Sequence, residues 1–210
     1  MALRLLPFRQ YNEHDVVNIF ALESDLALDS TTGDGEGSNG VFVKVTNGNF
    51  DQDVITYGSN SYLGKTNYPF VGGDMYPSNP LTLSGVASGD GPNAVLGITL
   101  NQTAKNDENG EKLLYNTTKK EELQAVLPGQ SVPVATRGIF TLSSDAFDGA
   151  ATDFTIGGGF IASNVNPGKI SGVAADTSES LGSVIGTGSR ASQGGITDQF
   201  AGDYVIVKLG

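Results

Sequence analysis

The side chains best suited to catalysis are scarce in this sequence. His14 is the only histidine, and cysteine is absent. A Ser-His-Asp triad or a histidine-based metal site would have to use His14. Thiolate nucleophiles, disulfides and cysteine metal sites are excluded. No serine has glycine at both −2 and +2, and none stands three positions before a lysine, so two common serine-nucleophile patterns are missing. The sequence therefore predicts no enzyme.

Acidic and glycine-rich stretches offer only weak alternatives. Asp29, Asp34 and Glu36 could supply oxygen ligands to Ca²⁺, as could the stretch NDENGE at 106–111, but neither matches the EF-hand spacing. Solvated loops are the simpler interpretation, and calcium binding stays open. The run GSVIGTGSR at 182–190 lacks the P-loop spacing and a following helix. We therefore expect neither a metal nor a cofactor.

Composition bounds the fold class and the partners. The 210 residues include 29 glycines, about twice the ~7% of ordinary proteins, and only 17% of residues are charged. This composition favours short strands joined by tight turns. The net charge is −11 and the 12 basic residues are scattered, so no surface for binding nucleic acid is expected. No window approaches the ~18 consecutive apolar residues of a membrane span.

Strand patterns follow one another through the body of the chain. Alternation predicts a strand in VFVKVTNGNF (41–50), two strands in 81–103, a long strand in SVPVATRGIFTLS (131–143) and a last strand in GDYVIVKLG (202–210). In the last strand, Val205, Val207 and Leu209 should point to one side, and Tyr204, Ile206 and Lys208 to the other. The sequence therefore predicts an all-β protein.

One short connecting helix is expected in TTKKEELQAVLPG (117–129). Thr118 could cap this helix, with Glu121 three residues later, and Pro128-Gly129 should end it. We therefore predict two small β barrels or a bilobed β sandwich. The predicted parts are an N-terminal docking arm at 1–28, an acidic glycine-rich loop at 29–40, a first β domain at 41–143 and a second β barrel at 144–210.

The opening segment, LLPFRQYNEHDVVNIFALE (5–23), mixes apolar and charged residues. Arg9 and Gln10 interrupt its apolar run, so it does not fit a secretory signal. Left exposed, its apolar side chains would be an aggregation liability. Two interpretations remain open: an extended arm that docks on another subunit, or the first elements of the protein's own core.

Several stretches resemble structural proteins of tailed bacteriophages: LRLLPFRQYNEHDVVNIFAL, AVLGITL, DENGEKLLYN, KKEELQAVLPGQSVPVATRGIFTL and GSVIGTG with the closing GDYVIVKLG. The sequence is most similar to the head decoration, or cement, proteins of T4-like phages of marine cyanobacteria. The segments Gly182–Ile185 and Val205–Leu209 also resemble the strands that close a small barrel in capsid-stabilising proteins. The resemblance implies a virion protein on the outer face of the capsid, often a homotrimer, without catalysis or cofactor.

With that resemblance, the leading hypothesis is a capsid decoration protein that clamps neighbouring major capsid subunits. Its predicted capsid and subunit interface is the opening segment: Arg4, Leu5, Leu6, Phe8, Arg9, Tyr11, Val16, Val17, Ile19 and Phe20. The alternative is a phage surface or fibre module that binds host glycans. For that role the contact residues would be Tyr57, Asn60, Tyr62, Asn67, Tyr68, Tyr76 and Asn79.

Overall fold

The structure is a computed structural model that describes residues 4–20, 39–47, 81–104, 106–107, 109–127, 130–173, 178–192 and 200–210. Its strands are β1 (Leu5–Gln10), β2 (Val16–Val17), β3 (Phe42–Asn47), β4 (Leu81–Gly85), β5 (Val95–Thr99), β6 (Gln102–Thr103), β7 (Ala125–Val126), β8 (Val134–Ala135), β9 (Gly138–Ser143), β10 (Gly159–Ala162), β11 (Ile170–Gly172), β12 (Gly182–Arg190) and β13 (Gly202–Leu209). The helix α2 spans Thr117–Glu122, and short 3-10 helices span Glu13–Asp15, Pro92–Ala94, Ser144–Ala146 and Ala151–Asp153.

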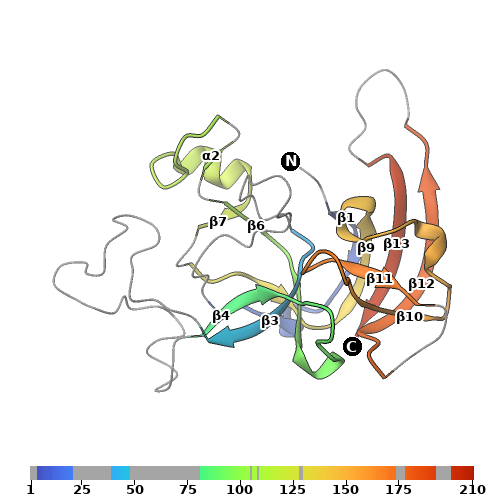
Figure 1. Cartoon of the computed structure of the whole chain (residues 1–210). Helices are drawn as coiled ribbons and strands as arrows, with labels where there is room; N and C mark the ends of the chain where they lie inside the picture. Colours follow the sequence, from blue (N-terminus) through green and yellow to red (C-terminus); the bar gives the residue numbers. More distant parts are fainter. Residues whose placement is uncertain are drawn as a thin grey trace.

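The strands form two main antiparallel sheets (Figure 1). Sheet A has the order β1-β9-β13-β12-β10-β11, and sheet B has the order β2-β8-β5-β3-β4. A small third sheet pairs β6 with β7 in parallel, next to α2. The predicted all-β class with a short helix is confirmed. Among the described strands neither main sheet closes on itself, so the architecture is a sandwich rather than two barrels.

The main core lies between the two sheets. Sheet A contributes Phe140, Phe160 and Val207, and sheet B contributes Phe42 and Ile98, all fully buried in one cluster. The rings of Phe42 and Phe160 meet edge to face with centroids 5.6 Å apart, a favourable aromatic geometry. These contacts fix the two sheets against each other.

Strand β13 alternates as the sequence predicts. Val205, Val207 and Leu209 are buried in the main core, whereas Tyr204 and Ile206 are half-buried on the opposite face. Successive side chains of a strand point to opposite faces of its sheet. Sheet A therefore has an inner face, which covers the core, and an outer face that also carries apolar side chains.

Sheet B is buried on both faces along β3. Phe42 packs into the main core, while Val41 and Val43 pack into a second cluster with Leu83, Val134 and Phe20. Such a strand reads as a continuous apolar run rather than a clean alternation. Burial on both faces explains the apolar run Val41-Phe42-Val43 at the start of this strand. The sequence pattern had indicated burial on one face only.

The long strand predicted at 131–143 is broken in two. Residues Val134–Ala135 form β8 in sheet B, and Gly138–Ser143 form β9 in sheet A. The chain changes sheet at Gly138, whose φ is +142° and whose added Cβ would lie 2.7 Å from the carbonyl oxygen of Gln10. Only glycine fits this conformation and this contact.

The opening segment is part of the protein's own fold. Strand β1 pairs with β9, and β2 pairs with β8. Leu5 (3% exposed) packs in the main core and Phe20 (8%) in the second cluster. The prediction of an extended N-terminal docking arm is therefore wrong for β1 and β2. Burial against strands of the same chain, which are already ordered, removes these apolar side chains from water and stabilises the fold. An arm extended into water would leave the same side chains exposed and would gain no such stabilisation.

The predicted domain boundary after residue 143 does not separate two folding units. Strand β9 pairs with β13 from Gly138↔Leu209 to Ser143↔Tyr204, so sheet A contains strands from both sides of the boundary. The main core likewise runs from Leu5 to Leu209. The loss of alternation within 144–158 reflects two 3-10 helices that lie over the sheet, not a linker between domains.

The short helix α2 lies where the sequence predicts a helix, but a different residue caps it. Asn116 is the N-cap, and its side-chain oxygen accepts the N–H of Lys119 at 3.2 Å. Thr118, the predicted cap, lies inside the helix. Leu113, Ala125 and Leu127 form a small separate cluster beside α2. This helical lobe lies away from β12 and β13 (Figure 1).

Candidate functional site

Among the described residues, His14 has no partner suited to catalysis or metal binding. It lies exposed in the 3-10 helix Glu13–Asp15, where its backbone N–H donates to the Asn12 side chain at 3.1 Å. Within the described part of the chain, no group of three or more His, Asp or Glu side chains could hold a metal ion. Across the same residues, no helix is long and apolar enough to span a bilayer.

The predicted interface residues divide by exposure. Arg4, Leu5, Leu6 and Phe20 are buried. Arg4, Leu5 and Phe20 cannot make docking contacts in this conformation, whereas Leu6 lies at the floor of a surface groove. Tyr11, Val16, Val17 and Ile19 are half-buried and pack against the two core clusters. Phe8 (73% exposed) and Arg9 remain at the surface.

Arg9 and Phe8 lie in different surroundings. The guanidinium of Arg9 is 5.9 Å from the ring centroid of Tyr11, and that ring stacks on Phe140 with centroids 6.0 Å apart. Arg9 is therefore held at the rim of the core. Phe8, by contrast, borders a surface groove, which makes it the one predicted apolar contact that stays open to a partner.

The groove lies on the outer face of sheet A and has a volume of about 870 Å³. Its walls come from four strands: Leu6 and Phe8 on β1, Thr141 on β9, Tyr204 and Ile206 on β13, and Arg190 on β12. Leu6 (6% exposed) and Thr141 (5%) form the floor, and Phe8 stands at the rim. We call this surface the outer-face groove.

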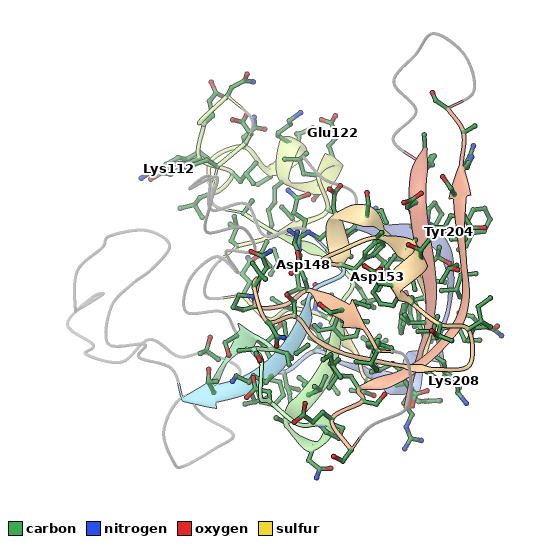
Figure 2. All side chains as sticks on the ribbon, turned by 45° about the vertical axis from the view of Figure 1, so that its right-hand side comes forward. Lys112, Glu122, Asp148, Asp153, Tyr204 and Lys208 are labelled. Atoms are coloured by element: carbon green, nitrogen blue, oxygen red, sulfur yellow. The ribbon has the colours of Figure 1, made fainter. Side chains whose placement is uncertain are left out.

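Two glycines of β12 shape the groove. Gly188 is opposite Tyr204 and Gly186 is opposite Ile206 in the ladder between β12 and β13. A Cβ on Gly188 would lie 2.6 Å from the Tyr204 hydroxyl oxygen and 2.7 Å from Cζ. The Tyr204 ring therefore lies across β12 in space that only glycine leaves open. Figure 2 shows Tyr204 at one end of sheet A and Lys208 at the other.

The charge of the groove is opposite in sign to that of the whole chain. Arg190 is its only charged lining residue, and no Asp or Glu lines it among the described residues. The Arg190 guanidinium is 5.9 Å from the ring centroid of Phe200, a cation–π distance. The chain as a whole carries a net charge of −11.

Most of this groove was not predicted from the sequence. Only Leu6 and Phe8 of its lining were predicted to make contacts, and for a different reason. The run YVIV at 204–207 could have indicated it, because Tyr204 and Ile206 place apolar side chains on the face opposite the core residues Val205 and Val207. Antiparallel strands that face water on one side usually alternate apolar with polar residues.

A second cavity, of about 460 Å³, lies near Pro92 and Leu96, against Leu181, Lys208 and Gly210. Its lining is mixed and brings together no pair of groups suited to proton transfer or nucleophilic attack. We assign it no function.

The cluster around Asp148 resembles a catalytic constellation only in composition. The hydroxyl of Ser163 donates to Asp148 Oδ2, and Asn166 Nδ2 donates to Oδ1 at 2.9 Å. Lys169 Nζ lies 3.7 Å from the same carboxylate. Ser163 is 2% exposed and its Oγ also accepts the N–H groups of Val165 and Asn166. The cluster therefore holds the loop between β10 and β11.

The acidic stretch at 106–111 likewise serves a turn. Asp107 Oδ1 accepts the N–H groups of Asn109 at 2.9 Å and Glu111 at 2.8 Å. Those bonds explain why a carboxylate tolerates burial there. The acidic residues Asp29, Asp34 and Glu36, and the tyrosines and asparagines of 57–80, lie outside the described residues.

Among the described residues, the Asp90 carboxyl group has a clearly shifted pKa. Lys44 Nζ donates to Asp90 Oδ2 at 2.6 Å, and this hydrogen bond is the main cause that lowers the pKa of Asp90 below its ordinary value. The backbone N–H of Ala87 donates to the same oxygen at 2.8 Å. The pair ties strand β3 to the turn that follows β4.

Comparison with known proteins gives no relative: no family model matches the chain, and neither a curated protein nor a solved structure is similar to it.

Proposed function

We propose that this protein is a non-enzymatic capsid decoration protein. It binds the outer surface of a phage head and clamps neighbouring major capsid subunits, through the outer-face groove rather than through a free arm. The observation that supports this proposal best is the groove itself, which leaves Phe8 73% exposed beside the apolar side chains of Leu6 and Ile206.

The physical argument starts from the outer face of sheet A. A large contiguous apolar patch that stays exposed on a folded protein is typical of an interaction site. Burying one such side chain fully contributes about 1.5–3 kcal/mol. Phe8 alone would therefore give weak attachment. A homotrimer repeats the contact three times, and linked contacts raise the overall affinity through their effective concentration.

Two further observations fit a binding protein. The described residues hold no accessible nucleophile with a base, since Ser163 is buried and His14 stands alone. The sequence also resembles head decoration proteins along most of its length. On this proposal the protein is part of the virion and lies on the outer face of the capsid, with the major capsid protein as its partner and with no nucleic acid or membrane bound.

The test uses purified protein and expanded phage heads that lack it. We expect saturable binding and a higher temperature of head rupture. Phe8→Ser should lower occupancy, because it removes the exposed ring from the groove. Ile156→Ser is the matched control, since Ile156 is 65% exposed and lies outside the groove. If saturating protein changes neither occupancy nor rupture temperature, the proposed function is wrong.

A further inference from the structure

We infer that Lys169 and Asn166 form an intramolecular isopeptide bond, and that Asp148 moves the proton between them. The bond joins the side-chain nitrogen of the lysine to the side-chain carbonyl carbon of the asparagine and releases ammonia. The inference goes beyond the proposed function and does not depend on it. It follows from the turn that brings the two side chains together and from the carboxylate that both of them face.

The turn between β10 and β11 brings the two reacting residues close together. Asn166, Pro167, Gly168 and Lys169 form a β-turn, in which the N–H of Lys169 donates to the carbonyl oxygen of Asn166 at 3.2 Å. Proline in the second position and glycine with a φ of +84° in the third are typical of a type II turn. The first and fourth Cα atoms of a β-turn lie within about 7 Å of each other. The two side chains can therefore reach one common partner.

That common partner is one oxygen atom of Asp148. Asn166 Nδ2 donates to Asp148 Oδ1 at 2.9 Å, and Lys169 Nζ lies 3.7 Å from the same oxygen. The second distance is longer than a hydrogen bond, but the lysine side chain is flexible and can close it. A single carboxylate oxygen therefore faces both the nitrogen that attacks and the nitrogen that leaves.

Ser163 positions this carboxylate and the loop that carries Asn166. Its hydroxyl donates to Asp148 Oδ2, so the other oxygen is left to face the two nitrogens. The Oγ atom also accepts the backbone N–H groups of Val165 at 3.0 Å and Asn166 at 3.1 Å. Because Ser163 is 2% exposed, it does not reach an external substrate, and the reaction that the cluster supports is one among its own members.

The reaction balances without a cofactor or an oxidant. Asp148 takes a proton from the ammonium group of Lys169, because only the neutral amine is a nucleophile. The amine attacks Cγ of Asn166, and the bond between Cγ and Nδ2 breaks as Asp148 returns a proton to Nδ2. The attacking nitrogen gives up its second proton through the same carboxylate, and ammonia leaves as ammonium, so Asp148 ends ionised. The side chains of Asp148 and Lys169 are only 21% and 14% exposed, which limits competition from water.

The bond would close a turn that already connects the two sheets. The N–H of Gly168 donates to the carbonyl oxygen of Val86 at 2.8 Å, and the carbonyl oxygen of Gly168 accepts the N–H of Phe42 at 3.0 Å. Phe42 belongs to sheet B, whereas β10 and β11 belong to sheet A. A covalent link across the turn would therefore fix the conformation that holds sheet A against sheet B.

The test is mass spectrometry of the purified full-length chain. The crosslinked protein should be lighter than its sequence by one ammonia molecule. Trypsin does not cleave after a lysine whose side chain is acylated, and Lys169 is the only internal cleavage site of the segment 138–190, so this segment should stay in one piece. Cleavage after Lys44, which pairs with Asp90, should stay complete. An unchanged mass would overturn the inference, and so would a lighter protein that is cleaved fully after Lys169.

Variants assign the roles. Asn166→Ala and Lys169→Arg should keep the mass of their sequences. Asn164→Ala is the matched control in the same loop and should still crosslink, because Asn164 is exposed and its side chain accepts a hydrogen bond from Ser88 rather than contacting Asp148. Asp148→Asn should slow crosslinking by about a hundredfold or more, with the fold checked by circular dichroism. Crosslinking in Asn166→Ala, or at the wild-type rate in Asp148→Asn, would overturn the assignment. Wild type and Lys169→Arg decide the bond itself, whatever the stability of Asp148→Asn.

The head-binding assay separates this inference from the proposed function. A crosslinked chain that does not bind heads would retain the isopeptide bond and reject the decoration role. A chain that binds heads and has the full mass of its sequence would retain the decoration role and reject the bond.

Discussion

Replacement of Leu5 by alanine tests whether the opening segment belongs to the core. Leu5 is 3% exposed, is opposite Leu142 in the ladder between β1 and β9, and its N–H donates to the Asn39 side chain at 3.2 Å. The substitution removes three buried carbon groups, at about 0.8 kcal/mol each. Because β1 is an edge strand and can relax into the space, we add little for a cavity. The free energy of unfolding should fall by about 2–3 kcal/mol.

The measurement is urea denaturation of wild type and variant, followed by circular dichroism. Phe8→Ala is the matched control on the same strand: it removes a larger side chain, but one that is 73% exposed, so its effect should stay within about 0.5 kcal/mol. For a protein of this size the melting temperature should fall by roughly 4–12 °C in Leu5→Ala. If both variants are equally stable, Leu5 is not a core residue and the docking-arm interpretation returns.

Three further substitutions test the described contacts. Ser163→Ala should lower the free energy of unfolding by about 1–3 kcal/mol, because it leaves the half-buried Asp148 carboxylate and two backbone N–H groups with one partner fewer. An unchanged urea midpoint would contradict this. Asp90→Asn should lower stability at pH 7, because the hydrogen bond from Lys44 lowers the pKa of Asp90 in the folded protein. The stability that ionised Asp90 contributes is complete above the ordinary pKa of 3.8 and is lost as the pH falls through its lowered pKa in the folded protein. The difference in unfolding free energy between wild type and Asp90→Asn should therefore shrink in acid. A difference that grows in acid would refute the ion pair between Lys44 and Asp90. Gly97→Ala should lower the free energy of unfolding by about 1–3 kcal/mol, because the added Cβ would overlap the backbone of β8. Gly91→Ala is the control, since the space around Gly91 is open, and it should leave stability unchanged. Equal melting temperatures of the two variants would exclude the overlap.

The sequence was sufficient for the class of fold and for individual strands. Period-2 alternation identified β3, β5 and β13 because it depends only on local side-chain direction. It could not show that SVPVATRGIFTLS changes sheet at Gly138, since β-branched residues suit either sheet equally. The reason lies in the close approach of Gln10 and Tyr11 to Gly138, which no local pattern contains.

The role of the opening segment shows the same limit more strongly. Leu5 and Leu6 have the composition expected of a docking arm or of a core strand. Their burial is decided by β9, more than 130 residues further along the chain. The outer-face groove depends equally on distant strands, so its residues could be suspected from the run YVIV but not assembled into one surface. Of the predicted interface residues, Phe8 is exposed and lines the groove, and its role as a contact stays a prediction.

The order of strands in sheet A has a consequence for biosynthesis. Strand β13 lies between β9 and β12, and it is the last described strand to leave the ribosome. Until residues 202–209 are available, the partner of β9 on that side is missing and the layer over Phe140 and Phe160 stays incomplete. Folding must then wait for contacts between distant parts of the chain, which makes it slow. Chains that stop before residue 202 would expose the apolar strands of sheet A and be prone to aggregation.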